Sequence, residues 1–219
     1  MVIVNTNTLF NQLKQQIQSK PFVLLQMYSD VKAHPQENRV SCYYVDFQDE
    51  QYIVPIHHTE KYQDDFEIIE TDQTIFVQDL KQYKHNTLVI SKDIRDMNWA
   101  YYLQHNKSYE SEQHLTSAHL HHNRLHYNKQ NINDLIPLVK HVEYFESISK
   151  QLYDSYQEQD QTLLENLYKI ERNGLKTYEK IIYSEYNPYT STGRPSNRFG
   201  GLNFAALNKS DGSRKQFIS

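Results

Sequence analysis

The residues with the clearest chemical potential form one short run near the end of the chain. Residues 186–197 read YNPYTSTGRPSN, which places Arg194 directly after the pair Thr192-Gly193. Glycine permits the positive φ of a tight turn, and a guanidinium held on such a turn presents planar donors at a fixed place. Those donors suit phosphate oxygens or the minor groove, where every base pair offers acceptors at similar positions. The run predicts a contact with nucleic acid; a solvated glycine-rich loop is the alternative.

The charge distribution favours the same segment. From Thr190 onward the chain has five basic residues and one acidic residue, whereas the first 189 residues hold 18 basic and 26 acidic ones. All five glycines follow residue 173. A basic segment on an acidic body indicates a local surface for phosphate rather than a protein that coats nucleic acid along its whole length. A solvated basic tail would carry the same charge.

Residues 190–196 (TSTGRPS) resemble the Thr-x-Thr-Gly-Arg-x-Ser motif of family-A DNA polymerases, and the phage members most of all. The Pro-Asn-Leu-Gln-Asn element of the family has a degenerate counterpart at 200–208, and the strand that leads to motif A has one at 212–218. The resemblance implies that residues 186–219 open a polymerase palm and stop before its first catalytic aspartate. It also implies a set of residues that would bind primer-template DNA, the last three through backbone phosphate: Thr192, Arg194, Ser196, Asn197, Asn203, Lys209, Arg214 and Lys215.

The groups that polymerisation requires are missing from this sequence. Two-metal nucleotidyl transfer uses two carboxylates, and the family motifs that supply them do not occur in the 219 residues. The resemblance therefore implies no cofactor in this chain and Mg²⁺ in a complete polymerase. The remainder would lie in the same chain or in a separate one. We expect this chain alone to be inactive as a nucleotidyltransferase.

Family-A polymerases commonly place a ribonuclease-H-like 3′–5′ exonuclease domain before the palm, and two short motifs resemble parts of it, at 52–57 (YIVPIH) and 170–175 (IERNGL). An active editor needs an Asp-x-Glu on the first strand, where this sequence has Gln26 and Tyr28. Asp96 could supply a second aspartate, and the third position lacks one. Since one carboxylate does not hold two metals, we expect the domain to be inactive. An active exonuclease with differently aligned carboxylates is the alternative.

Apolar periodicity predicts the elements that must position these residues. Residues 6–19 predict a helix with Thr6 or Thr8 as its N-cap. Strands are predicted at 22–27, 40–47, 51–56, 74–77 and 87–91, with a hairpin at 48–50 and a helix that ends near His85. Beyond Asp93 the pattern is helical, and one stripe (Leu163, Leu164, Leu167 and Ile170) ends at Asn173-Gly174, a good C-cap pair.

This order predicts an α/β fold, a mixed sheet with flanking helices, for which the resemblance implies ribonuclease-H-like topology. Residues 1–150 would form the exonuclease-like domain, 151–185 a helical linker or reduced thumb, and 186–219 the first part of the palm. So short a thumb would grip duplex product weakly, which implies a processivity partner. Half of a split polymerase, or a non-enzymatic DNA-binding or replisome accessory protein, would fit the same features.

Several classes are excluded or disfavoured. No run of eighteen apolar residues exists, so we expect no membrane span, and the N-terminus lacks the pattern of a secretory signal. The single cysteine, Cys42, fits a reducing compartment and predicts a packed strand thiol. His122 and His126 have the i,i+4 spacing of a zinc pair without a third ligand, which favours a solvated helix face and no metal site. We expect a cytoplasmic protein, in the host cytoplasm if it is a phage product.

Overall fold

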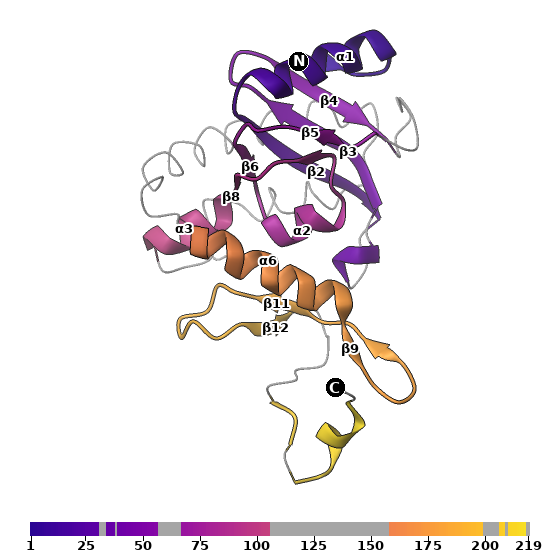
Figure 1. Ribbon diagram of the computed structural model, residues 1–219, viewed down its shortest axis with the longest axis vertical. Helices are drawn as coiled ribbons and strands as arrows, with labels where there is room; N and C mark the ends of the chain where they lie inside the picture. The colour runs from indigo at the N-terminus through magenta and orange to yellow at the C-terminus, as the bar shows by residue number, and fades with distance from the viewer. Residues whose placement is uncertain are drawn as a thin grey trace.

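The computed structural model describes residues 1–30, 34–37, 39–56, 67–105, 158–198, 206–208 and 210–217. A six-stranded mixed sheet with flanking helices forms the N-terminal body (Figure 1), so the predicted α/β class is confirmed. In spatial order its strands are β1 (Val2–Ile3), β4 (Gln51–Pro55), β3 (Arg39–Asp46), β2 (Phe22–Asp30), β6 (Ile75–Val77) and β8 (Ile94–Asp96).

The sheet is antiparallel in its middle and parallel at both ends, since β1 pairs in parallel with β4. The strands β2, β3 and β4 form an antiparallel meander, whereas β6 and β8 continue the sheet parallel to β2. The predicted hairpin between β3 and β4 is confirmed: Phe47 N donates to Glu50 O at 3.0 Å, and Gln48 has a φ of 76°. The parallel strands β6 and β8 end side by side, with Val77 opposite Asp96, next to Leu24 of β2, which continues to Asp30.

The helix α1 (Asn7–Ser19) starts and packs as its sequence predicts. Thr6 caps it, since its hydroxyl accepts a hydrogen bond from Leu9 N at 3.3 Å. Phe10, Leu13 and Ile17 are buried in the main hydrophobic core. Cys42 is fully buried in β3 with a free thiol, as expected of a packed strand cysteine.

Between β6 and α6 the structure agrees with the prediction in part. The helix α2 (Leu80–His85) follows β6 as expected, and α3 (Met97–His105) follows β8. The strand predicted at 87–91 forms as β7 (Val89–Ile90), but it pairs with β5 (Ile69–Glu70) outside the main sheet. The helical prediction for residues directly after Asp93 is wrong, because Ile94–Asp96 is strand β8; three residues are too few to show a period.

The helix α6 (Glu158–Asn173) packs against α2 and lies between α2 and the C-terminal hairpins in Figure 1. The predicted end at Asn173-Gly174 is confirmed. Only two members of the predicted apolar stripe, Leu164 and Leu167, are buried, whereas Leu163 and Ile170 are 42% and 46% exposed. The buried face instead continues through Tyr168 and Glu171, and a charged residue cannot be recognised on a buried face from apolar periodicity.

Two short hairpins follow α6. The first joins β9 (Leu175–Lys176) to β10 (Ile181–Ile182), and the second joins β11 (Glu185–Asn187) to β12 (Ser196–Arg198). Two 3₁₀ helices complete the described elements, η1 (Pro35–Glu37) and η5 (Ser213–Gln216). A bridge between Thr177 and Phe217 ties the η5 segment to the first hairpin. No helix within the described ranges is long and apolar enough to cross a membrane.

Gly174, which ends α6, cannot accept a side chain without strain. Its φ is 64°, and a Cβ there would lie 2.6 Å from Ile181 Cγ2 and 2.9 Å from Ile182 O. We expect Gly174→Ala to lower the free energy of unfolding by about 2–4 kcal/mol, since left-handed strain and overpacking add. Gly212→Ala is the matched control, because its φ of 78° is similar but nothing lies within 4 Å. Equal losses in urea titrations of the two variants would contradict this account.

Candidate nucleic-acid interface

The turn predicted from Thr-Gly-Arg joins β11 to β12. Its backbone is closed by Gly193 N, which donates to Thr190 O at 3.0 Å, and Gly193 has the positive φ (68°) that favours glycine. The Thr190 hydroxyl donates to Arg194 O at 2.7 Å. The antiparallel register, with Tyr186 opposite Asn197, then fixes the base of the hairpin. Arg194 therefore follows a turn whose backbone is fixed on both sides.

The tip of this hairpin is open to solvent. Residues 191–196 are all exposed, and this stretch includes Thr192, Arg194 and Ser196. In the part of the chain that the structure describes, no hydrogen bond or ion pair involves the Arg194 guanidinium. Asn197 differs, because it is half-buried and its amide donates to the Ser184 hydroxyl. The tip therefore presents one arginine and several hydroxyl groups that could meet a phosphate or a base edge.

The other predicted DNA-binding residues do not gather at the tip. Arg214 and Lys215 are exposed on η5, which lies away from the hairpin tip in Figure 1. The Arg214 guanidinium donates to Leu207 O from Nε at 3.1 Å and from Nη2 at 3.0 Å. It therefore also holds the fold of its own segment. Asn203 and Lys209 lie outside the described residues.

Aromatic residues hold the hairpin against α3. Tyr189 is 9% exposed, and its ring centroid lies 6.0 Å from that of Trp99 and 5.9 Å from that of Tyr102. The Tyr102 hydroxyl donates to Thr190 O at 2.8 Å, on the first residue of the turn. Trp99 is itself fixed to α6, because its indole N–H donates to Asp160 Oδ1 at 2.9 Å. These contacts seat the N-terminal side of the turn on the α/β body.

A buried ion pair holds the hairpin from its other end. Lys81 Nζ of α2 lies 2.6 Å from Glu171 Oε1 of α6, and their side chains are 3% and 0% exposed. Both groups also bind the backbone of Tyr186 in β11: Tyr186 N donates to Glu171 Oε1 at 2.7 Å, and Tyr186 O accepts from Lys81 Nζ at 2.5 Å. One residue of the hairpin thus has both backbone groups bound by an ion pair from two helices.

The electrostatics favour the ionised form of this pair. Burial would lower the pKa of Lys81, but the negative charges of Glu171, Asp79 and Glu185 outweigh this effect, so the pKa of Lys81 is raised. Burial would raise the pKa of Glu171, but His85, the Lys81 charge and the Tyr186 N–H together lower it. A buried charge is stable when a partner and hydrogen bonds replace its water. The pair is therefore charged while it forms hydrogen bonds with the backbone N–H and C=O of Tyr186.

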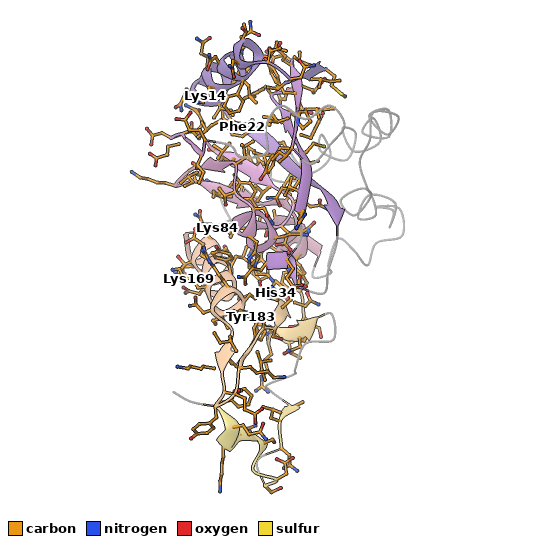
Figure 2. The ribbon with its side chains drawn as sticks, turned by 90° about the vertical axis from the view of Figure 1, so that its right-hand side faces the viewer. Lys14, Phe22, His34, Lys84, Lys169 and Tyr183 are labelled. Atoms are coloured by element: carbon orange, nitrogen blue, oxygen red, sulfur yellow. The ribbon has the colours of Figure 1, made fainter. Side chains whose placement is uncertain are left out.

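Two histidines border the ion pair. His85 Nε2 lies 3.8 Å from Glu171 Oε2, too far for a normal hydrogen bond. Figure 2 shows His34 near Tyr183, and the His34 ring centroid is 5.6 Å from those of both His85 and Tyr183. Burial, together with His85, lowers the pKa of His34. These rings pack the junction between η1, α2 and the segment before β11.

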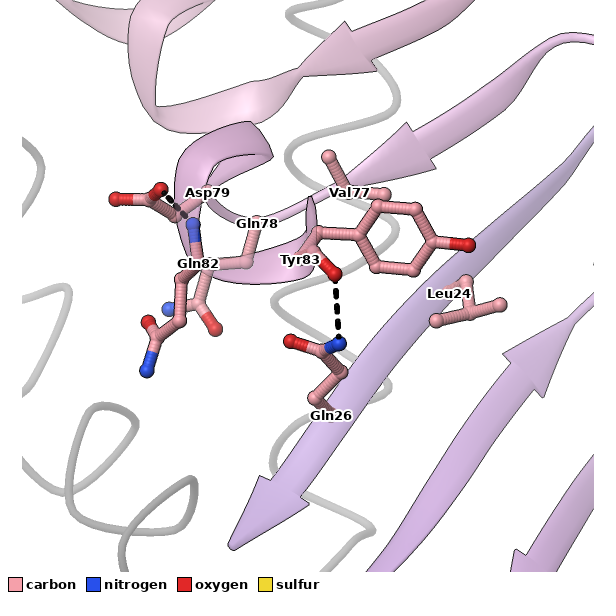
Figure 3. A pocket seen from close by; sticks show the side chains of 7 residues that line it. All are labelled: Leu24, Gln26, Val77, Gln78, Asp79, Gln82 and Tyr83. Carbon is pink, nitrogen blue, oxygen red and sulfur yellow. Dashed lines mark hydrogen bonds between the residues drawn. The ribbon is translucent and has the colours of Figure 1, made fainter. Parts of the chain in front are cut away.

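A small polar pocket, rather than a set of carboxylates, lies where β6 ends beside the middle of β2 (Figure 3). Gln26 of β2 is 8% exposed, and its amide donates to Tyr83 O at 3.2 Å and to Asn86 O at 2.5 Å. The pocket holds about 10 Å³, enough for one water molecule. Its lining has one carboxylate and three glutamines among Leu24, Gln26, Val77, Gln78, Asp79, Gln82 and Tyr83. Asp79 caps α2, since its Oδ1 accepts from Gln82 N at 2.9 Å.

Asp96 ends β8 instead of lying in the helix predicted beyond Asp93. It is fully buried, and its two oxygens accept hydrogen bonds from Leu80 N and from Trp99 N, both at 2.8 Å. It therefore caps the first turns of α2 and α3. Burial and the charge of Asp79 raise the pKa of Asp96 well above its usual range. The side chain of Tyr28, the third carboxylate position of the exonuclease motif (at 148) and the histidine pair His122 and His126 lie outside what the structure describes.

The described residues contain no group of three or more His, Cys, Asp or Glu side chains that could hold a metal ion. Sequence reasoning missed Lys81, Trp99 and Tyr102 as residues that hold the candidate interface. Glu171 stood inside a recognised motif, but nothing in the sequence indicated its partner. The chain matches no protein-family model, and no curated protein is significantly similar to it. The functional assignment therefore depends on the motif and on the geometry.

Proposed function

We propose that this chain is the N-terminal part of a phage-type family-A DNA polymerase. Its residues 1–150 would form a degenerate, ribonuclease-H-like exonuclease domain, and residues 186–219 would contact primer-template DNA. The catalytic carboxylates and their Mg²⁺ would belong to the remainder of the polymerase, in the same or another chain. A processivity partner would offset the short thumb.

The observation that carries this proposal is the exposed Arg194 on a fixed turn. The motif resembles a primer-binding motif in sequence, and the structure folds it into a hairpin tip whose arginine faces solvent. The contacts of Tyr186, Tyr189 and Thr190 fix the backbone of the tip, so the exposed guanidinium starts from a defined position, which favours planar recognition of DNA. A loop that only faces solvent would not need these contacts of Tyr186, Tyr189 and Thr190 with the body.

The sheet order supports the exonuclease-like part of the proposal. Apart from the edge strand β1, the sheet has a central strand with an antiparallel meander on one side and two parallel strands on the other, the arrangement expected of a ribonuclease-H-like domain. The positions where such a domain would hold its metals carry Gln26 within β2, Gln78 after β6, and the two capping carboxylates Asp79 and Asp96. Both carboxylates already cap helices, which supports a loss of editing.

Binding of a fluorescent primer-template duplex, measured by anisotropy at increasing salt, tests the DNA contact. If three to five of the five cations after residue 189 meet phosphates, log K should fall against log salt with a slope of about −3 to −4.5. The acidic body should add little, so we expect modest affinity that is measurable at low salt. Binding that is absent at low salt, or insensitive to salt, would reject the proposal.

The degenerate domain is expected to show no 3′–5′ exonuclease activity with Mg²⁺ or Mn²⁺. Gln26 stands where a carboxylate is required, and two-metal hydrolysis fails without its ligands. The assay is release of nucleotides from a labelled single strand by the purified chain. Metal-dependent degradation that Asp96→Ala abolishes, in a variant shown to be folded, would prove an active nuclease instead.

A further inference from the structure

We infer that the buried Lys81–Glu171 pair positions the β11–β12 turn relative to the sheet body, so that Lys81 and Glu171 are positioning residues for the DNA contact of that turn. The inference rests on the proposed function of the turn. Neither side chain reaches solvent, so neither can touch DNA itself. Each acts through the backbone of Tyr186.

The geometry of Tyr186 gives the first argument. In a two-stranded antiparallel pair, alternate residues direct their backbone groups away from the partner strand. Tyr186 directs its N–H and C=O toward Glu171 and Lys81. The ion pair therefore takes the place of a neighbouring strand at this residue. A two-stranded hairpin alone is marginally stable in water, so such a substitute determines where β11 lies.

The origin of the two side chains gives the second argument. Lys81 is in α2, directly after the sheet strand β6, whereas Glu171 is in α6, which leads to the hairpins. The pair joins the sheet body to the segment that carries the turn, at the point where β11 begins. Tyr102 fixes Thr190 from α3, so the strand leading into the turn is held at two places, four residues apart. A change at either place would move Arg194.

A second ion pair between the same helices provides a matched control. Lys84 Nζ of α2 lies 2.8 Å from Glu165 Oε1 of α6, and both side chains are about a quarter exposed. No described contact joins this pair to β11. If the Lys81–Glu171 pair acts only by holding α2 to α6, the loss of either pair should have similar consequences for the hairpin. If the Lys81–Glu171 pair positions the turn, only the loss of that pair should change the hairpin and its DNA binding.

The test compares Lys81→Met/Glu171→Leu with Lys84→Met/Glu165→Leu in the full chain. We expect the first double variant to raise the hydrogen-exchange rate of the Tyr186 amide at least tenfold and to weaken primer-template binding roughly tenfold, with the control unchanged. In the first background, Arg194→Ala should have little further effect on affinity, because a misplaced turn no longer uses the arginine. Contacts that act independently would instead give additive losses.

The outcomes separate this inference from the proposed function. If Arg194→Ala alone weakens binding but the double variant binds as tightly as the unaltered chain, the positioning role is overturned and the DNA contact stands. Additive losses overturn the positioning role as well. If Arg194→Ala alone has no effect, the proposed function fails, and the positioning role fails with it. If the double variant does not fold, Glu171→Gln replaces it in the same two measurements, and we expect faster exchange of the Tyr186 amide and weaker binding. Unchanged exchange of the Tyr186 amide and unchanged affinity would reject the inference.

Discussion

Lys81→Met alone should lower the free energy of unfolding by about 3–5 kcal/mol, because it leaves a buried carboxylate without its partner. Glu171 is fully buried, so water cannot replace the lost ammonium. Glu171→Leu should cost a similar amount, since it leaves Lys81 buried and charged and removes the acceptor for Tyr186 N.

The double variant Lys81→Met/Glu171→Leu should be much closer to the unaltered chain than either single variant. Apolar residues of similar volume often replace a buried ion pair at little cost or with a gain. The remaining penalty should come from the backbone of Tyr186, which loses an acceptor and a donor. We therefore expect a coupling energy of a few kcal/mol between the two positions, at the upper end of the usual range for residues in contact.

Urea titration of the four proteins, followed by circular dichroism, measures this cycle. The Lys84–Glu165 pair is the control, because its side chains are about a quarter exposed and an ion pair that water can reach contributes only about 1 kcal/mol. Single losses below 1 kcal/mol at Lys81 and Glu171 would show that the pair is not buried as described. Additive losses in the double variant would show that the two groups do not depend on each other.

The strands and helices of the N-terminal body could be predicted because local patterns determine them. The helix at 7–19 has a cap and three buried apolar residues at helical spacing, and the hairpin after Phe47 has a polar break between two apolar runs. The strand Ile94–Asp96 could not be predicted, because its state depends on the neighbouring strand β6. Tertiary pairing decides such short runs more than their own propensity does.

The turn of the candidate interface could be predicted from the sequence, but the residues that hold the turn on the body could not. Thr190, Gly193 and Arg194 are close in sequence, so their turn geometry follows from local chemistry. The partners of Tyr186 are 105 and 15 residues away in the chain, and a buried lysine looks like any surface lysine in a sequence. The structural role of Asp96 could not be predicted either, because the Leu80 N–H of α2 becomes its neighbour only through the pairing of β8 with β6.

Arg194→Ala should weaken primer-template binding by about 10- to 150-fold, since a charge-assisted hydrogen bond contributes roughly 1.5–3 kcal/mol. The stability of the chain should change little, because the side chain is exposed and no described contact depends on it. Arg172→Ala is the control for net charge. Arg172 is exposed on α6 and donates to the Tyr168 hydroxyl at 2.8 Å, away from the turn.

Arg194→Lys distinguishes two ways in which the turn could meet DNA. Lysine keeps the charge but loses the planar fork, so a contact that only neutralises phosphate should survive with nearly full affinity and the same salt dependence. A guanidinium that contacts base edges in the minor groove needs its fixed donors, and lysine should then lose most of what alanine loses. We expect the second result, because the turn fixes the backbone of Arg194 and the segment has other cations for phosphate. If both variants bind primer-template DNA as tightly as the unaltered chain, the turn has no primer-binding role.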